Sequence, residues 1–157
     1  MIRRTVRPAV WAIAAATGLA LAGPAATADA ATSPAEALRH TVIALVNVAR
    51  TANGCTALRE TAALDRSATS HARDMSANDY FSHSSLDGTS WYARVHSFGT
   101  KYPGGENIAM GFYSATSVMT AWLASPGHRA NILDCQFKSI GVGQAGNGGY
   151  WVEDFAY

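Results

Sequence analysis

The sequence predicts an α+β domain in which helices pack on a small antiparallel sheet. Two observations support this fold class. Apolar residues recur at helical spacing through most of residues 33–124, whereas two apolar and aromatic runs of strand length follow at 139–144 and 150–157. Helices first and strands late is a typical α+β order, and no internal repeat or low-complexity linker interrupts it.

The first two helices are predicted with their ends. Ser33 and Pro34 form a favourable helix start, a serine N-cap followed by proline, and the helical spacing continues until Asn53-Gly54. A second helix is predicted over residues 61–77, with its buried stripe on Leu64, Ala68, His71 or Ala72, and Met75.

Two further helices precede the strands. Residues 88–90 (GTS) open a short third helix that ends at Gly99. A fourth helix is predicted from about residue 114 to residue 124, and Ser125-Pro126-Gly127 is expected to break it. The segment 101–105 is rich in turn residues, and residues 107–110 are expected to be a short extended piece.

A β-hairpin is predicted at the C-terminus. Residues 139–144 (SIGVGQ) and 150–157 (YWVEDFAY) surround the connection 145–149 (AGNGG). An Asn-Gly-Gly connection between two such runs is typical of a hairpin turn.

Residues 1–30 are predicted to be a signal peptide that does not belong to the fold. Arg3, Arg4 and Arg7 form a positive region, residues 10–22 are apolar, and Ala28-Asp29-Ala30 provides a cleavage site between small residues. The alternative is an uncut membrane anchor, but the apolar run is shorter than the about 20 residues that span a bilayer. We therefore expect a secreted, extracellular protein without a stable membrane anchor, consisting of residues 31–157.

The charge balance excludes two classes of partner. Removal of residues 1–30 takes away three arginines and Asp29, which lowers Lys plus Arg from 12 to 9 and Asp plus Glu from 11 to 10, a net charge of −1. Nucleic-acid binding needs clustered Lys and Arg, and no basic run is present. The same lack of basic residues argues against electrostatic attachment to a membrane surface. One domain is expected, and a monomer.

The two cysteines, Cys55 and Cys135, are predicted to form a disulfide, because an even pair in an exported chain is normally oxidised. The alternative, a pair of catalytic or metal-binding thiols, is weaker because neither cysteine lies in a CxxC motif or beside a histidine.

Three short motifs place titratable side chains beside glycines and other turn-forming residues. They are His83 in YFSHS (80–84), Glu106 in GGENIAM (104–110) and His128 in SPGHRANIL (125–133). At the loop positions expected for them, two imidazoles and a carboxylate form a candidate polar site.

These motifs resemble the CAP superfamily (cysteine-rich secretory proteins, antigen 5 and pathogenesis-related 1), in its secreted bacterial branch. The resemblance covers about residues 38–157, and its motifs occur in the family's order. The matching positions are Leu45, Val46, Asn47, Arg50, Gly54, Leu58, Leu64, Met75, 81–84 (FSHS), Asp87, Gly88, Arg94, 105–109 (GENIA), Trp122, 125–133 (SPGHRANIL), 140–143 (IGVG), Tyr150 and Trp151.

The resemblance implies a three-layer α-β-α sandwich with a three- or four-stranded antiparallel sheet. It also implies a cleft lined by His and Glu residues, which in some relatives holds a divalent metal. His83 and Glu106 carry over directly, and His128 is the histidine of the bacterial PGHR turn. The eukaryotic pattern has a further Glu where this chain has Ser125, and a further His where it has residues 150–153 (YWVE), so the full tetrad is not present.

Three interpretations of His83, Glu106 and His128 remain open. Two imidazoles and one carboxylate suffice for zinc, with a fourth position left for water or substrate. A hydrogen-bonded structural cluster is the plainer alternative, because a buried glutamate needs a partner. The third interpretation is catalysis, in which a bound zinc acidifies its water for hydrolysis. Glu153 is the candidate for a second carboxylate, although strand alternation allows Asp154 instead.

Three functions follow from these interpretations. The first is an extracellular module that binds a lipid, a cell-wall ligand or a divalent metal, as the resemblance implies for the wider family. The second is a metal-dependent hydrolase, a peptidase or a cell-wall-acting enzyme, that uses His83, Glu106 and His128. The third is a structural or interaction protein with a vestigial cleft.

Overall fold

The computed structural model describes residues 33–146 and 149–157, and the predicted signal peptide lies outside them. Residues 147–148, part of the predicted hairpin connection, lie outside them as well. The elements are α1 (Pro34–Ala52), β1 (Arg59–Glu60), α2 (Ala62–Asn78), α3 (Trp91–Ser97), β2 (Pro103–Ala109), α4 (Ala115–Ala124), α5 (Pro126–Ile132), β3 (Ser139–Ala145) and β4 (Tyr150–Ala156).

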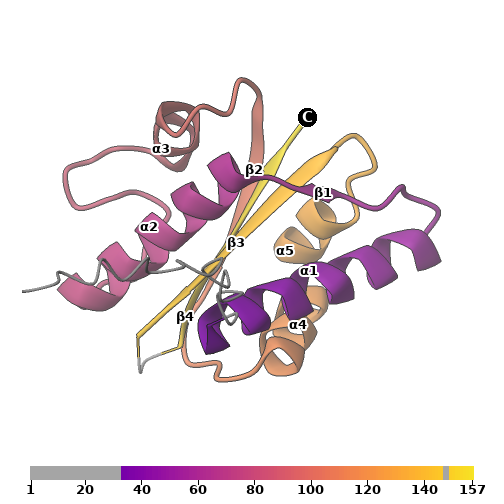
Figure 1. Cartoon of the computed structure of the whole chain (residues 1–157), viewed down its shortest axis with the longest axis horizontal. Helices are drawn as coiled ribbons and strands as arrows, with labels where there is room; N and C mark the ends of the chain where they lie inside the picture. Colours follow the sequence, from indigo (N-terminus) through magenta and orange to yellow (C-terminus); the bar gives the residue numbers. More distant parts are fainter. Residues whose placement is uncertain (1–32, 147–148) are drawn as a thin grey trace, which may run out of the picture. The chain divides into compact units, whose positions relative to one another are not determined.

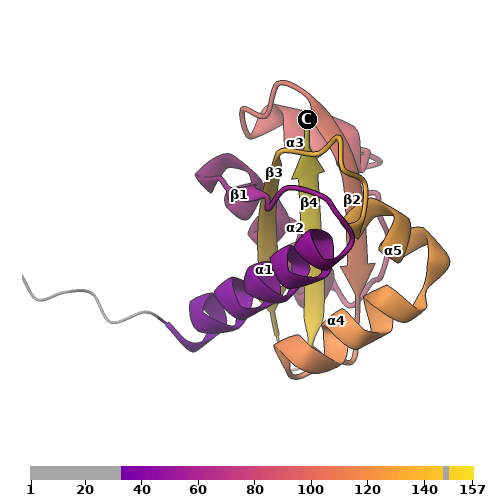
Figure 2. The same cartoon turned by 90° about the vertical axis from the view of Figure 1, so that its right-hand side faces the viewer.

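The described residues form three layers around a four-stranded sheet with the order β1-β3-β4-β2. Helices α2 and α3 pack on one face of the sheet, and α1, α4 and α5 pack on the other (Figure 1). In Figure 2, α1 lies in front of the strands. The predicted α+β class and α-β-α sandwich are confirmed. The sheet is mixed, however, because the two-residue β1 runs parallel to β3, while β2 and β3 both pair antiparallel with β4.

The predicted helix starts are confirmed by their caps. The side chains of Ser33, Thr61, Ser90 and Ser114 each accept a hydrogen bond from the backbone N–H three residues later. Each bond satisfies a donor that the first turn of a helix leaves unpaired. The apolar stripe predicted for α2 is buried as well.

One helix was not predicted, and one segment was predicted wrongly. Ser125-Pro126-Gly127 ends α4 as predicted, with Ser125 as its C-cap, but a further helix, α5, begins directly after it with Pro126 at its first position. Proline is favourable there because the first helical N–H has no partner within the helix. The segment predicted as turn and short extended piece is instead a seven-residue strand, β2.

Two glycines allow α2 to lie directly on the sheet. A Cβ atom on Gly141 would come within 2.2 Å of the Leu64 carbonyl carbon, and one on Gly143 within 2.2 Å of the Ala68 carbonyl carbon. Any side chain at these positions of β3 would therefore push the helix away from the strand.

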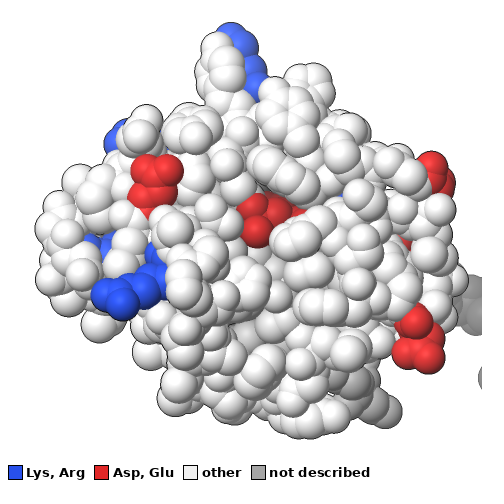
Figure 3. Space-filling view, turned by 180° about the vertical axis from the view of Figure 1, so that it is seen from behind, with Lys and Arg blue, Asp and Glu red and all other residues white. Residues whose placement is uncertain are grey.

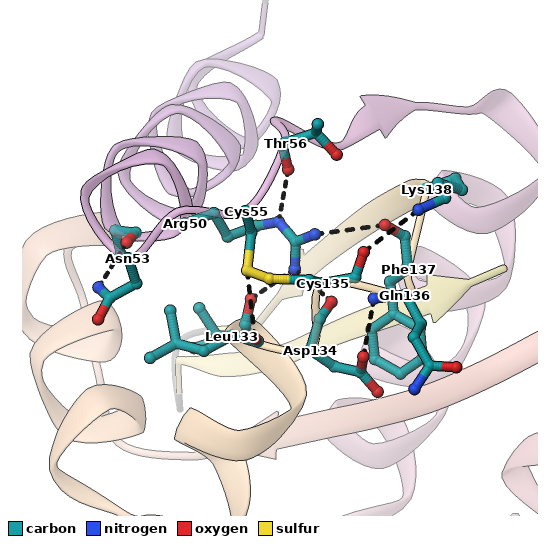
Figure 4. The surroundings of a disulfide bond; sticks show 12 residues. Arg50, Asn53, Cys55, Thr56, Leu133, Asp134, Cys135, Gln136, Phe137 and Lys138 are labelled. Atoms are coloured by element: carbon teal, nitrogen blue, oxygen red, sulfur yellow. Dashed lines mark hydrogen bonds between the residues drawn. A yellow bond between two sulfur atoms is a disulfide. The ribbon is translucent and has the colours of Figure 1, made fainter.

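The predicted disulfide between Cys55 and Cys135 is confirmed, and it lies beside the fully buried Arg50 (Figure 4). The Arg50 guanidinium donates to four backbone carbonyls, those of Thr56, Ile132, Asp134 and Phe137, at 2.7–3.3 Å. One arginine and one disulfide thus join the end of α1 to the segment between α5 and β3.

No helix in residues 33–146 and 149–157 has the length and hydropathy needed to cross a membrane.

Candidate ligand-binding cleft

The candidate site lies along β2, which is an edge strand of the sheet. Glu106 is at the middle of this strand, and its side chain is fully buried. Its two carboxylate oxygens have different partners: Oε1 accepts from Nδ1 of His83 at 2.7 Å, and Oε2 accepts from the guanidinium of Arg94. Of the predicted site residues, the structure therefore brings His83 and Glu106 into direct contact.

Arg94 of α3 is the residue that organises this site. Its buried guanidinium compensates the charge of Glu106, and it also donates to the His83 carbonyl and to Ser85 Oγ, both at 3.2 Å. A buried carboxylate is tolerated when it is paired and hydrogen-bonded, and Arg94 and His83 meet both conditions. The same arginine fixes the loop that carries His83.

The His83 imidazole is positioned by this arrangement and remains accessible. The Glu106 carboxylate is paired with Arg94, so it can only accept a hydrogen bond from His83. We therefore assign a hydrogen to Nδ1 of His83, and Nε2 takes no part in the contact with Glu106. The side chain of His83 is 49% exposed, whereas that of Glu106 is inaccessible. A buried carboxylate that orients a half-exposed histidine is an arrangement suited to binding a polar group or moving a proton.

His128 lies on α5, near His83 but in different surroundings. It is half-buried, and burial, followed by repulsion from a protonated His83, lowers the pKa of the His128 imidazole. The prediction of loop positions was correct for His83 and wrong for Glu106 and His128, which lie on β2 and α5. The PGHR segment is helical because hydrogen bonds attach α5 to the sheet.

Two asparagines attach α5 to the edge strand. Asn107 Nδ2 donates to the His128 carbonyl at 3.1 Å, and Asn131 Nδ2 donates to the Glu106 carbonyl at 3.3 Å and to Asn107 Oδ1 at 2.9 Å. Trp122 of α4 adds a bond from Nε1 to the Ile108 carbonyl at 3.3 Å. Backbone groups at the free edge of β2 are thus paired with side chains, and the helix is held at the cleft.

The two acidic residues of β4 lie on opposite faces of the sheet. Asp154 pairs in register with Glu106, and Glu153 pairs with Asn107, so only Asp154 shares the face of Glu106. Burial and the charge of Glu106 raise the pKa of Asp154 well above its ordinary value. Glu153, the residue preferred by the sequence interpretation, accepts from Asn107 Nδ2 at 3.0 Å on the other face, and burial raises its pKa to about 8.

His71 contacts the loop that carries His83. It is buried on α2, as the sequence indicated, and its Nε2 contacts the Ser82 carbonyl at 2.8 Å, one residue before His83. Burial, followed by the charge of Arg94, lowers the pKa of His71. A neutral His71 with its hydrogen on Nε2 donates to this carbonyl and holds the loop against α2.

Two cavities of different polarity follow β2. The first, of about 370 Å³, is lined by His83, Trp91, Gly104, Gly105, Glu106 and Asn131. The second, of about 310 Å³, is lined mainly by apolar side chains, with His128 among them: Phe81, Ile108, Ala109, Met110, Phe112, Ala121, Trp122, Ser125 and His128. The surface in Figure 3 has a recess with acidic atoms at its base and mostly uncharged atoms around it.

These residues do not fit a metal ion as they are arranged. Both oxygens of Glu106 are engaged, one of them by the positively charged Arg94, which leaves His83 and His128 as the remaining predicted ligands. A zinc site takes three or four protein ligands. Within the described ranges, no group of three or more His, Cys, Asp or Glu side chains is placed to hold a metal.

Sequence reasoning understated two residues of the site. Arg94 is one of the positions that match the family, but its ion pair with Glu106 was not predicted from the sequence. Asp154 was left as an alternative to Glu153. The pairing of residues 106 and 154 places Asp154, and not Glu153, on the face of Glu106. This register cannot be read from the sequence of either strand alone.

Comparison with known proteins finds related sequences. The sequence profile of the Cysteine-rich secretory protein family, CAP, matches residues 43–155. YkwD of Bacillus subtilis is 37% identical over 130 residues, which make up 82% of this chain and 51% of YkwD. This chain therefore spans about half the length of that curated relative.

Solved structures show the same fold. An extracellular protein of Bacillus anthracis that contains an SCP domain superposes with a TM-score of 0.71 and 29% identity, over 76% of this chain and 40% of that one. An outer surface protein of Borrelia burgdorferi superposes with a TM-score of 0.67 and 21% identity, over 74% of this chain and 90% of that one. At this lower identity the likeness concerns the fold alone.

Proposed function

Because this chain belongs to the Cysteine-rich secretory protein family, CAP, we propose that its domain is an extracellular binding module whose ligand occupies the cleft along β2. The disulfide and the name of the Bacillus anthracis relative support the extracellular location. One observation supports the ligand site: a polar cavity around His83 and Glu106 and an apolar cavity are both lined by the same strand, β2.

The two cavities favour a small amphipathic ligand. Its polar group would contact the half-exposed His83, whose ring is already oriented by Glu106. Its apolar part would cover Phe81 and Met110, which are each 47% exposed at the second cavity. Covering such side chains releases water from apolar surface, and a preformed site avoids the entropic cost of ordering the protein.

Binding of a pyrene-labelled fatty acid, followed by pyrene fluorescence, tests this proposal. Phe81→Ser should weaken binding by about tenfold, the effect of losing one buried aromatic contact, and His83→Gln should weaken it through the polar group. Tyr113→Ser is the control, because Tyr113 is 71% exposed and lines neither cavity.

The outcomes separate this function from the alternatives. Saturable binding that Phe81→Ser and His83→Gln weaken, and Tyr113→Ser does not, supports an amphipathic ligand in the cleft. Equal binding by all variants, or no saturable binding, would contradict it and favour an interaction protein with a vestigial cleft.

A hydrolase is the second candidate, and the contact of His83 with a buried carboxylate is the observation that favours it. A histidine held at Nδ1 by a carboxylate can act as a general base through Nε2. This arrangement calls for a metal-independent reaction, in contrast to the metal-dependent enzyme predicted from the sequence. Hydrolysis of peptides or cell-wall fragments that persists in chelator and is lost in His83→Gln would support it.

A further inference from the structure

A second groove, of about 520 Å³, lies on α2 away from the cleft. Its lining is formed by Arg39, Ala62, Asp65, Arg66, Thr69, Ser70, Arg73 and Phe98. The positions on α2 recur every three or four residues, on the side of the helix opposite its buried stripe. The groove therefore uses the outward face of α2, with Arg39 contributed by α1 and Phe98 by the end of α3.

The groove and the cleft are at opposite edges of the sheet. Arg39 donates to the Val142 carbonyl at 3.4 Å, and Asp65 Oδ1 accepts from the Val142 N–H at 3.2 Å, so both residues adjoin β3. The cleft follows β2, which is separated from β3 by β4. A ligand in the groove would leave the proposed ligand site accessible.

The charge of the groove is positive. Three arginines outnumber the two acidic residues, Asp65 in the lining and Glu60 beside it. None of the three ion pairs among the described residues involves Arg39, Arg66 or Arg73. Asp65 is also held by the Val142 N–H, and burial is the main cause that raises its pKa to about 6. The guanidinium groups of these arginines therefore have N–H donors available to bind an anion.

The lining is also partly preorganised. Arg39 donates to Thr69 Oγ1 at 3.3 Å as well as to Val142, which fixes its guanidinium at one side of the groove. Arg66 and Arg73 are seven residues apart on α2, which is about 10 Å along the helix axis. The half-buried Phe98 adds an aromatic surface between helices.

We propose that this groove binds an organic anion, a phosphate or sulfate ester whose anionic group pairs with the arginines and whose apolar part contacts Phe98. Arginine suits this role because its planar fork of donors matches the oxygens of phosphate and sulfate, with bonds stronger than those between neutral groups. The proposal goes beyond the cleft function and does not depend on it.

The test uses the ¹⁵N-labelled protein, titrated with 4-methylumbelliferyl phosphate, 4-methylumbelliferyl sulfate and the neutral 4-methylumbelliferone. Saturable amide shifts are expected along α2 for one or both esters, with binding at least about tenfold weaker for the neutral compound. The two esters distinguish phosphate from sulfate selectivity. Higher salt should weaken the binding, because the pairing is electrostatic and solvent-exposed.

Variants identify the groups responsible. Arg66→Gln and Arg73→Gln, both at exposed positions, should each weaken ester binding by about fivefold to tenfold. Arg129→Gln removes an exposed arginine of α5 outside the groove and should have no effect. Equal binding of the neutral compound, an equal loss in Arg129→Gln, or no saturable shift up to about 10 mM ester would overturn the proposal.

Discussion

Glu153→Gln should stabilise the protein at neutral pH. Glu153 is fully buried, one carboxylate oxygen accepts from Asn107, and the other oxygen, Oε1, has no partner among the described residues. Burial raises the pKa of this carboxyl from its ordinary 4.5 to about 8, so the folded state holds a proton that the unfolded chain releases above pH 4.5. At pH 7 the chain must therefore bind a proton when it folds, which costs free energy. A neutral glutamine at this position needs no proton and avoids that cost.

The size of the expected difference in the free energy of unfolding follows from the linkage between protonation and folding. Because the pKa is raised in the folded state, the stability that this group contributes is complete below pH 4.5 and is lost as the pH rises towards 8. Each pH unit in that window costs about 1.4 kcal/mol. The free energy of unfolding of Glu153→Gln should thus exceed that of the wild type by about 3 kcal/mol at pH 7 and by about 4 kcal/mol at pH 8, where the folded-state carboxyl is itself half ionised.

Urea unfolding from pH 4 to pH 9 measures this difference. Subtracting the wild-type curve from the variant curve cancels the contributions of other titrating groups that both proteins share. Glu36→Gln, in the first turn of α1, is the matched control and should show no comparable slope. A difference that stays constant across the pH range would refute the argument that Glu153 is protonated in the folded protein.

Three further substitutions have expected outcomes. Replacing Cys55 and Cys135 by serine should lower the free energy of unfolding by about 4–5 kcal/mol on the chain-entropy model, because the disulfide closes a loop of 80 residues. Denaturant unfolding of the double variant measures this loss. Arg50→Met should cost at least about 3 kcal/mol, because four carbonyls lose their donor, two of them in buried hydrogen bonds and two in part-buried ones. An unchanged unfolding midpoint would contradict the hydrogen bonds assigned to it. Gly143→Ala should lower the melting temperature, since its Cβ would meet the backbone of Ala68. Gly127→Ala is the control, because no neighbouring atom of the described residues lies within 4 Å of the added Cβ.

The helices and the hairpin were predictable because their determinants are local. Serine and threonine caps mark four helix starts, and the change from helical to strand periodicity marks β3 and β4. Strand β2 was largely missed because Pro103, Gly104 and Gly105 are weak strand formers, and the strand depends on its pairing with β4. Helix α5 was missed because the sequence contains Pro126 and Gly127, while the bonds from Asn107 and Asn131 come from the tertiary structure.

The candidate site was predictable in part for the same reason. Motifs identified His83 and Glu106, which are in contact, but a motif does not show which charged groups compensate one another. The pairing of Arg94 with Glu106 changes the chemistry of the site, because it occupies the carboxylate that a metal would need. That pairing depends on how α3 is placed against β2 and cannot be inferred from spacing along the chain.

The position of Arg50 has a consequence for the order in which the chain folds. Arg50 lies in the last turn of the first helix, but three of its four carbonyl partners are 82 to 87 residues further along the chain. The adjoining strand β1 likewise pairs with β3, so the N-terminal third cannot complete its own hydrogen bonds. Contacts this distant in sequence slow folding, because the intervening chain must be ordered before they form. We therefore expect α1 to reach its native packing late, only once the segment between α5 and β3 has been synthesised and brought against it.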